Sequence, residues 1–269
     1  MSEIILEACE LVRTFGGGRT WYGARKPTTR AVDGVSLAVE RGRTLGVVGE
    51  SGCGKSTLAR MLTGLLAPTA GEIRLEGRPV HGLKGAERLA FHRTVQLVFQ
   101  DPLSSLNPRR TVRQILGGPL RALLGLDRGE RADRVLELMQ LVSLRPEFID
   151  RYPHEFSGGQ CQRIGIARAL AALPRLLVLD EPVSALDVSM QAQVLKLLRD
   201  LQHRLGLTYV FISHDLAVVE ALCDRVMVMH RGQVVEEAER AELFARPQHP
   251  YTRQLLSAVP VPGRQRQVA

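Results

Sequence analysis

The sequence lacks the features that place a chain within a membrane or in an oxidising compartment. No apolar run approaches the roughly 18 residues that a membrane-spanning helix needs. Residues 1–6 have no basic segment followed by a long apolar one, as a signal peptide would. The four cysteines form no C-x-x-C pair and show no zinc-ligand spacing, so we expect reduced thiols. These absences predict a cytosolic chain.

Aromatic residues are also scarce, at 4% of the chain, whereas 36 lysine and arginine residues, nearly all arginine, give a net charge of +8. A basic surface can bind nucleic acid, bind an anionic membrane, or simply be solvated. A single-strand nucleic-acid binder usually stacks bases on aromatic side chains. Direct nucleic-acid binding is therefore the least favoured of the three interpretations.

What is present indicates a globular α/β protein with a large core, since 45% of the residues are hydrophobic and 24% are charged. Strand-like segments alternate with helical ones, except for a helical block between residues 101 and 173. The predicted strands are 7–13, 34–40, 44–48, 71–77, 94–100, 175–181, 208–212, 225–229 and 233–236. The predicted helices are 58–62, 111–116, 130–142, one beginning at Ser157, 188–205, and two short ones near 241–245 and 251–258.

Residues 49–57, Gly-Glu-Ser-Gly-Cys-Gly-Lys-Ser-Thr, fit the phosphate-binding pattern G-x-x-x-x-G-K-[ST] between a predicted strand and a helix. The glycines let backbone N–H groups turn inward, and the helix N-terminus adds further unpaired donors. Lys55 would reach the β- and γ-phosphates of ATP, and Ser56 would coordinate Mg²⁺. Cys53 could be unusually reactive among these donors. The residues expected to bind ATP here are Gly49, Glu50, Ser51, Gly52, Cys53, Gly54, Lys55, Ser56 and Thr57.

Two carboxylates, Asp180 and Glu181, end an apolar strand downstream of this loop. An acidic pair at a strand end indicates chemistry rather than packing, and without a cation the two charges would repel each other. We interpret Asp180 as the residue that holds Mg²⁺ and Glu181 as the catalytic residue that polarises the attacking water.

At residues 156–160, Phe-Ser-Gly-Gly-Gln, the chain resembles the nucleotide-binding subunit of an ATP-binding cassette (ABC) transporter. Ser157 is the expected N-cap of a helix, which makes a second phosphate-binding N-terminus. The resemblance implies that this signature caps the γ-phosphate of ATP held by a partner subunit. The residues it assigns to this binding in trans are Ser157, Gly158, Gly159, Gln160 and, from the D-loop, Asp187.

Other family motifs follow in order over roughly residues 5–257. The resemblance implies that Gln100 is the Q-loop glutamine, which contacts ATP and Mg²⁺, and that His214 is the catalytic switch histidine. Phe15 corresponds to the aromatic residue that stacks on adenine, with Trp21 and Tyr22 as lesser candidates. For Phe15 the alternative is simple packing at a strand end.

The segments 99–109, 181–189 and 248–252 further resemble the importers of dipeptides, oligopeptides and nickel. Within that group, residues 155–160, Glu-Phe-Ser-Gly-Gly-Gln, resemble the second of the two different ATPase subunits that such importers usually carry. The implied fold is a P-loop NTPase (RecA-like) core with an antiparallel β subdomain and an inserted α-helical signature subdomain. The implied division gives residues 1–100 and 174–240 to the core and its N-terminal β subdomain, 101–173 to the helical subdomain, and 241–269 to a family tail. Because this tail has no cysteine-rich extension, the nickel or metal-chelate branch is the alternative to peptides.

The resemblance implies a heteromeric importer that uses ATP and Mg²⁺. Its other parts would be a second, different ABC ATPase subunit bound head to tail, two transmembrane permease subunits and an extracytoplasmic substrate-binding protein. The chain would lie peripherally on the cytoplasmic face of the inner (plasma) membrane, with residues 103–109 as the candidate permease contact. The rival is a soluble ABC ATPase acting on nucleic acid or ribosomes, which the single cassette and the importer-like tail disfavour.

Overall fold

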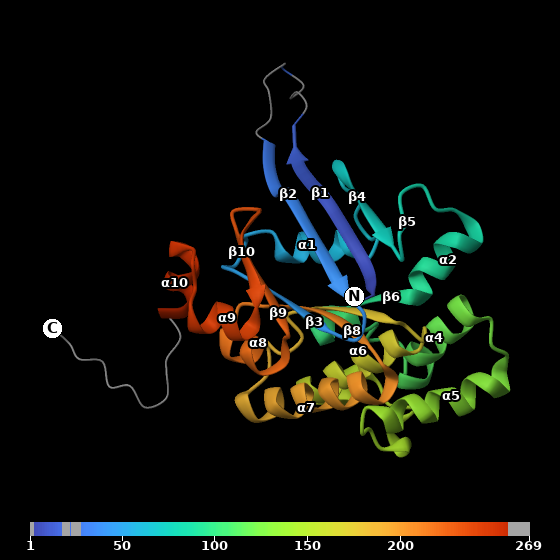
Figure 1. Cartoon of the computed structure of the whole chain (residues 1–269). Helices are drawn as coiled ribbons and strands as arrows, with labels where there is room; N and C mark the ends of the chain where they lie inside the picture. Colours follow the sequence, from blue (N-terminus) through green and yellow to red (C-terminus); the bar gives the residue numbers. More distant parts are fainter. Residues whose placement is uncertain (1–2, 18–21, 23–27, 258–269) are drawn as a thin grey trace.

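The computed structural model describes residues 3–17, 22 and 28–257, which form two sheets and a set of helices (Figure 1). The six-stranded sheet has the order β10-β9-β3-β8-β7-β6. Its strands are β3 (Thr44–Val48), β6 (Val95–Val98), β7 (Leu176–Asp180), β8 (Thr208–Ser213), β9 (Arg225–His230) and β10 (Gln233–Glu239). All its pairings are parallel except that of β9 with β10. The residues of β3, β7 and β8 are all buried, as in a parallel sheet covered on both faces.

The four-stranded sheet is antiparallel, in the order β2-β1-β4-β5. Its strands are β1 (Ile4–Gly16), β2 (Thr28–Glu40), β4 (Ala70–Leu75) and β5 (Arg78–Pro79). The predicted pairing of the first two strands is confirmed, and both are longer than the sequence pattern indicates. The α/β fold with an antiparallel sheet beside a parallel one is therefore confirmed.

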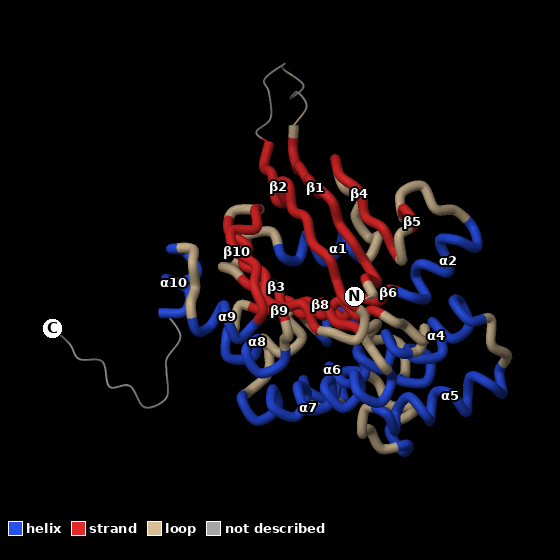
Figure 2. The backbone as a smooth tube through the Cα atoms, in the orientation of Figure 1, coloured by secondary structure: helices blue, strands red, loops and turns tan. Residues whose placement is uncertain are grey.

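The helices of the block between β6 and β7 lie on one side of the six-stranded sheet, and the four-stranded sheet lies on the other (Figure 2). This block contains α3 (Pro102–Ser105), α4 (Val112–Leu124), α5 (Arg128–Leu141) and α6 (Gly158–Leu170), with two short 3-10 turns, Pro146–Phe148 and Pro153–Glu155. The remaining helices are α1 (Lys55–Leu62), α2 (Gly85–Thr94), α7 (Val188–Leu205), α8 (Leu216–Leu222), α9 (Arg240–Ala245) and α10 (Pro250–Ser257). No helix in the described part of the chain is both long and apolar enough to cross a membrane.

The structure differs from the predicted helices at α2, α4 and α8. Helix α2 is not predicted by the sequence pattern, because only Phe91 of its residues is buried and the apolar periodicity is weak. Thr94 consequently ends a helix and does not begin a strand. Helix α8 is also missed, and α4 continues past the predicted end at residue 116 through Gly117, Gly118 and Pro119, which are poor helix formers.

The buried side chains form two clusters, one on each side of the six-stranded sheet. Alternate residues of β7 enter different clusters: Leu176 and Val178 pack toward α1 and the four-stranded sheet, and Leu177 and Leu179 pack toward the helices. The helices α4–α6 share their cluster with α7 and β8. The proposed boundaries of a separate helical subdomain therefore stay a prediction.

Candidate active site

The phosphate-binding loop joins the buried strand β3 to helix α1 and is packed between two backbone segments. Gly49 has φ 152°, and a Cβ atom there would lie 2.2 Å from the carbonyl oxygen of Met229 on β9. Gly54 has φ 111°, and its Cβ atom would lie 2.0 Å from the carbonyl oxygen of Ala31 on β2. Backbone oxygens cannot move aside as a side chain would, so both positions require glycine.

Lys55 lies inside the curve of this loop and is only 4% exposed. Its Nζ atom donates hydrogen bonds to the carbonyl oxygens of Gly49 (2.7 Å) and Glu50 (2.8 Å). These two hydrogen bonds hold the ammonium group against the backbone at the start of the loop.

The predicted reactivity of Cys53 is wrong. Burial raises the pKa of the Cys53 thiol, and the nearby Lys55 offsets this only in part. The thiol packs against the core and therefore ionises less readily than an exposed cysteine.

The carboxylate of Asp180 lies at the end of β7, and its Oδ1 atom accepts a hydrogen bond from the Ser56 hydroxyl (3.0 Å). Asp180 is 5% exposed. Burial raises the pKa of its carboxyl, and the Ser56 hydrogen bond opposes this shift. Two oxygen groups, one of them a poorly solvated carboxylate, thus lie together at the start of α1, a donor set that suits a hard cation.

Glu181 contacts the two other predicted residues that follow strands of the parallel sheet, Gln100 and His214. One of its carboxylate oxygens, Oε2, accepts a hydrogen bond from Gln100 Nε2 (2.9 Å) and lies 3.1 Å from His214 Nδ1. Gln100 follows β6, Glu181 follows β7 and His214 follows β8. Glu181 also has φ 47°, a strained conformation for a residue other than glycine, and its N–H donates to the Ile212 carbonyl (3.0 Å). The backbone is thus fixed where the carboxylate has to point into the site.

Part of the loop and the three residues that follow the strand ends line one cleft of about 450 Å³, whereas Gly49, Glu50, Cys53 and Asp180 are not among its lining residues. The lining residues are Ala31, Ser51, Gly52, Gly54, Lys55, Ser56, Thr57, Gln100, Glu181 and His214. The structure therefore brings together the loop, the Q-loop glutamine, the carboxylate and the histidine that the sequence singled out, and it adds Ala31.

The signature residues do not line this cleft. Ser157 caps α6: its Oγ accepts from the Gln160 N–H (3.3 Å), and Gln160 Oε1 accepts from the Ser157 N–H (3.0 Å). Gly158 and Gly159 form the first turn of that helix, so its N-terminus has the predicted form. Asp187 likewise caps α7, accepting from the Met190 N–H (2.9 Å).

Phe15 and Tyr22, two of the aromatic residues considered for adenine stacking, do not line the cleft either. Phe15 is 41% exposed at the end of β1, and the Arg13 guanidinium carbon lies 4.9 Å from its ring centroid. Tyr22 is exposed, and Trp21 lies outside the described residues. The assignment of Phe15 stays a prediction.

One contact of the loop is not anticipated by the sequence motifs. The N–H of Glu50 donates a hydrogen bond to the hydroxyl oxygen of Tyr251 on α10 (3.2 Å). From the sequence, residues 248–252 could be interpreted only as a family marker. Glu50 and Tyr251 are 201 positions apart, and no local pattern connects them.

Comparison with known proteins gives consistent similarities along the whole chain. A family model described as "ABC transporter" matches residues 32–184, and one described as "Oligopeptide/dipeptide transporter, C-terminal region" matches residues 235–269. The chain is 51% identical over 263 residues to the oligopeptide transport ATP-binding protein OppF of Escherichia coli (strain K12), covering 97% of this chain and 79% of that protein. It is also 51% identical over 262 residues to the probable peptide ABC transporter ATP-binding protein y4tS of Sinorhizobium fredii, covering 97% of this chain and 74% of that protein.

Among solved structures, the chain resembles the dimeric ATP-binding cassette MJ0796 in a post-hydrolysis state with ADP and Pi, with a TM-score of 0.76 and 29% identity over 88% of this chain and 99% of that one. It also resembles cbiO1 from Clostridium perfringens, part of the ABC transporter complex cbiONQ, with a TM-score of 0.75 and 29% identity over 91% of this chain and 92% of that one.

Proposed function

The chain belongs to the ABC transporter family of ATP-binding proteins, and we propose that it is the ATP-hydrolysing subunit of an importer for dipeptides or oligopeptides. The observation that carries the peptide assignment is the similarity to peptide-transport ATP-binding proteins over 97% of the chain, including the separate C-terminal region that the oligopeptide and dipeptide family model describes.

In this proposal the cleft binds the ATP phosphates and the strand ends carry out hydrolysis. Lys55 and the inward N–H groups of the loop neutralise the β- and γ-phosphates. Glu181 accepts a proton from the attacking water as the water approaches the γ-phosphate. Gln100 and His214 both contact the same Glu181 oxygen, which supports a role for them in orienting that carboxylate.

The residues near Lys55 also fit Mg²⁺. Ser56 and Asp180 would hold it, together with phosphate oxygens of ATP and with the amide oxygen of Gln100. When bound, the ion would supply positive charge to the phosphates. In the described part of the chain no group of three or more His, Cys, Asp or Glu side chains is placed to hold a metal ion. Because Ser56 and Asp180 already lie within hydrogen-bond distance beside the phosphate-binding loop, we propose that the protein binds Mg²⁺ and ATP together.

The position of the signature supports a head-to-tail dimer with a second ABC ATPase. The residues Ser157–Gln160 present a helix N-terminus but do not line the cleft of their own chain. An N-terminus of this kind binds anions, so a γ-phosphate held by a partner would complete the site. The relative MJ0796 is described as a dimeric structure. Asp187, at the N-terminus of α7, would face the same partner.

We further propose that the partners are a different ABC ATPase chain, two transmembrane permease subunits and an extracytoplasmic substrate-binding protein, with this chain on the cytoplasmic face of the membrane. Residues 103–109, which include the exposed Leu103, are the proposed permease contact. Since the binding protein and the permeases select the solute in such a system, a nickel or metal-chelate substrate is the alternative that the experiment must separate from peptides.

Affinity purification of the tagged Glu181→Gln variant from detergent-solubilised native membranes with ATP, followed by mass spectrometry, tests the proposal. The variant should keep ATP binding and lower turnover about a hundredfold, which holds the complex closed. Recovery of two polytopic membrane proteins and a second ATPase would support the importer. A peptide-binding or a nickel-binding protein encoded with the recovered partners would then decide the substrate. Recovery of nucleoprotein partners alone would contradict transport.

A further inference from the structure

Helix α10, the last helix in the described part of the chain, contacts the phosphate-binding loop through the buried side chain of Tyr251. The Tyr251 hydroxyl oxygen accepts the N–H of Glu50 at 3.2 Å. The Tyr251 ring is 8% exposed and stacks on His230, with the ring centroids 4.0 Å apart and the planes at 25°. The stacked ring thus fixes the hydroxyl against one backbone donor of the loop.

The start of α10 is itself anchored on β10. The two carboxylate oxygens of Glu236 accept hydrogen bonds from the N–H groups of Gln248 (2.7 Å) and His249 (3.0 Å). His249 Nδ1 in turn accepts from the Tyr251 N–H (3.2 Å). Tyr251 is therefore placed by contacts to two strands of the sheet, because His230 ends β9 and Glu236 lies on β10.

We propose that Tyr251 is a positioning residue for the phosphate-binding loop, so that the C-terminal region of this family helps to set the affinity for ATP. The inference rests on the proposed ATP site. The loop contains Gly49, Gly52 and Gly54 at positive φ, and such a loop loses much conformational entropy when it is ordered around a ligand. A hydrogen bond that orders the loop beforehand lowers this cost. Tyr251 does not line the cleft with Glu181, so it acts on binding and not on the hydrolytic step.

The test compares Tyr251→Phe with Tyr209→Phe in the full chain. Tyr209 is the matched control, because its buried hydroxyl donates to the Leu198 carbonyl (2.8 Å) away from the cleft. Tyr251→Phe should raise the Kd and the KM for ATP about three- to tenfold, with kcat changed less than about twofold. Tyr209→Phe should lower thermal stability and leave the Kd unchanged.

An unchanged Kd in Tyr251→Phe, with a stability loss like that of the control, would overturn the positioning role. Lys55→Ala separates this failure from failure of the ATP site. If Lys55→Ala weakens ATP binding and Tyr251→Phe does not, only the role of Tyr251 is lost. If Lys55→Ala has no effect, the proposed site itself is wrong.

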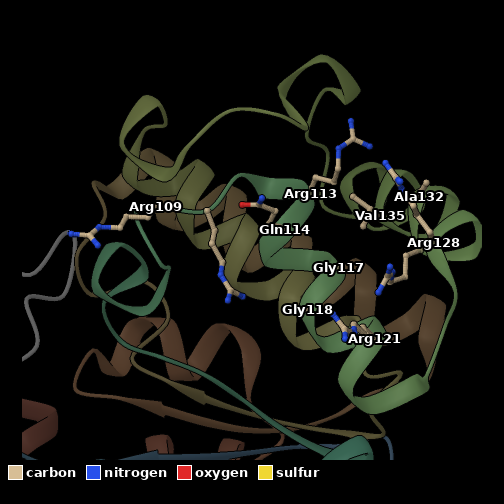
Figure 3. Close-up of a pocket in the computed structure, with 11 residues that line it drawn as sticks. Arg109, Arg113, Gln114, Gly117, Gly118, Arg121, Arg128, Ala132 and Val135 are labelled. Atoms are coloured by element: carbon tan, nitrogen blue, oxygen red, sulfur yellow. The ribbon is translucent and has the colours of Figure 1, made fainter.

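An independent observation concerns a cavity of about 690 Å³ between α4 and α5, which contains none of the predicted ATP-site residues. Its walls carry six arginines, Arg109, Arg110, Arg113, Arg121, Arg128 and Arg131, and its described lining residues include no carboxylate. Figure 3 shows Arg121 and Arg128 extending from facing helices into the space between them.

The arginine charges are largely uncompensated. Arg113 makes a bidentate pair with Asp150, with both N···O distances at 2.8 Å. Among the residues that the structure describes, the side chains of the other five arginines have no hydrogen bond or ion pair. Arg128 is also the first residue of α5, where the helix dipole disfavours a cation. A guanidinium cannot lose its proton to relieve this repulsion.

Two glycines line part of the cavity, where the absence of side chains lets a ligand approach the backbone closely. Gly117 and Gly118 lie there in α4, ahead of Pro119, although each of these residues weakens a helix. A Cβ atom at either glycine would meet no atom within 4 Å, so packing within this chain does not require them.

We infer that this cavity binds a small anion with clustered phosphate groups. Planar guanidinium groups bind phosphate through paired hydrogen bonds, which an ammonium cannot do, and no lysine is among the lining residues that the structure describes. The phosphates could belong to a soluble compound or to a lipid headgroup. An acidic protein segment is the competing occupant.

The probes are inositol hexakisphosphate, phosphatidylglycerol vesicles and a polyglutamate peptide, each titrated into the full chain. Arg121→Gln with Arg128→Gln should weaken binding of one phosphate probe about tenfold or more, and whichever probe responds identifies the source. The matched control, Arg204→Gln with Arg246→Gln, removes the same charge from exposed arginines elsewhere and should have little effect. Equal losses in both double variants, or tighter binding of polyglutamate than of either phosphate probe, would overturn the site.

Discussion

At the scale of single residues, the two neighbouring carboxylates of the site differ sharply in environment. Glu181 has two polar partners at one oxygen, Gln100 and His214. Asp180 is buried and receives a hydrogen bond only from Ser56 among the described side chains. Neighbouring carboxylates in unlike surroundings can take different roles, one toward a cation and one toward a proton.

The buried charge of Asp180 should cost stability until a cation is present. Burial raises the pKa of Asp180, so the folded state holds its proton to a higher pH than the unfolded state does. Above that raised pKa the charge destabilises the fold, and as the pH falls toward the ordinary carboxyl value of about 4 the cost disappears. Asp180→Asn should therefore raise the melting temperature of the protein without ATP and metal by about 2 °C or more at neutral pH.

The same variant should lose Mg²⁺-dependent ATP hydrolysis, so stability and activity change in opposite directions. Calorimetry from pH 4 to pH 8 measures the first effect, and the difference from wild type should shrink at the acid end. A variant that is less stable at every pH would mean that the Ser56 hydrogen bond outweighs the burial of the charge.

At the scale of elements, three helices begin with a reciprocal capping box: α4 at Thr111 and Gln114, α5 at Asp127 and Glu130, and α6 at Ser157 and Gln160. Such a cap satisfies N–H groups that the helix leaves unpaired. The pattern is local in sequence, which is why the start of α6 can be predicted from Ser157 alone.

Comparing two of these caps distinguishes an effect on stability from an effect on ATP hydrolysis. Thr111→Ala and Ser157→Ala each remove one capping oxygen and should each lower the free energy of unfolding by about 1 kcal/mol. Only Ser157→Ala should also reduce ATPase activity of the assembled complex, by about tenfold or more, since it alters the proposed trans phosphate site. Denaturant unfolding and steady-state hydrolysis give the two readouts. Equal ATPase activity in the two variants would mean that Ser157 only caps helix α6 and has no role in the proposed trans phosphate site.

What could be predicted from the sequence follows the same division between local and distant contacts. The loop around Lys55 and the acidic strand end are contiguous motifs, and the parallel strands that bring their ends together are apolar enough to recognise. Helix α2 could not be predicted because its neighbours bury only one of its side chains. The contact of Tyr251 with Glu50 depends on the packing of α10 against the finished sheet, which no short pattern encodes.

At the scale of the whole molecule, the two helix N-termini that we propose as anion sites, those of α1 and α6, do not share one cleft. The loop before α1 lines the cleft with Glu181, whereas the signature before α6 does not. Both N-termini can therefore bind phosphate at the same time only if the molecule takes part in two ATP sites. In one site the ATP is held by the loop of this chain, and in the other the signature of this chain contacts ATP held by the partner.

This arrangement predicts reciprocal labelling of the assembled pair of ATPases by a photoreactive ATP analogue, which marks the chain whose loop holds the nucleotide. Lys55→Ala should abolish labelling of this chain and leave labelling of its partner largely intact. Ser157→Ala should do the reverse, because it removes the cap of the site on the partner's loop. Thr111→Ala, with the same type of cap lost, should change neither. If Ser157→Ala instead reduced labelling of its own chain alone, the two anion sites would serve one nucleotide within one chain, and the head-to-tail dimer would have to be abandoned.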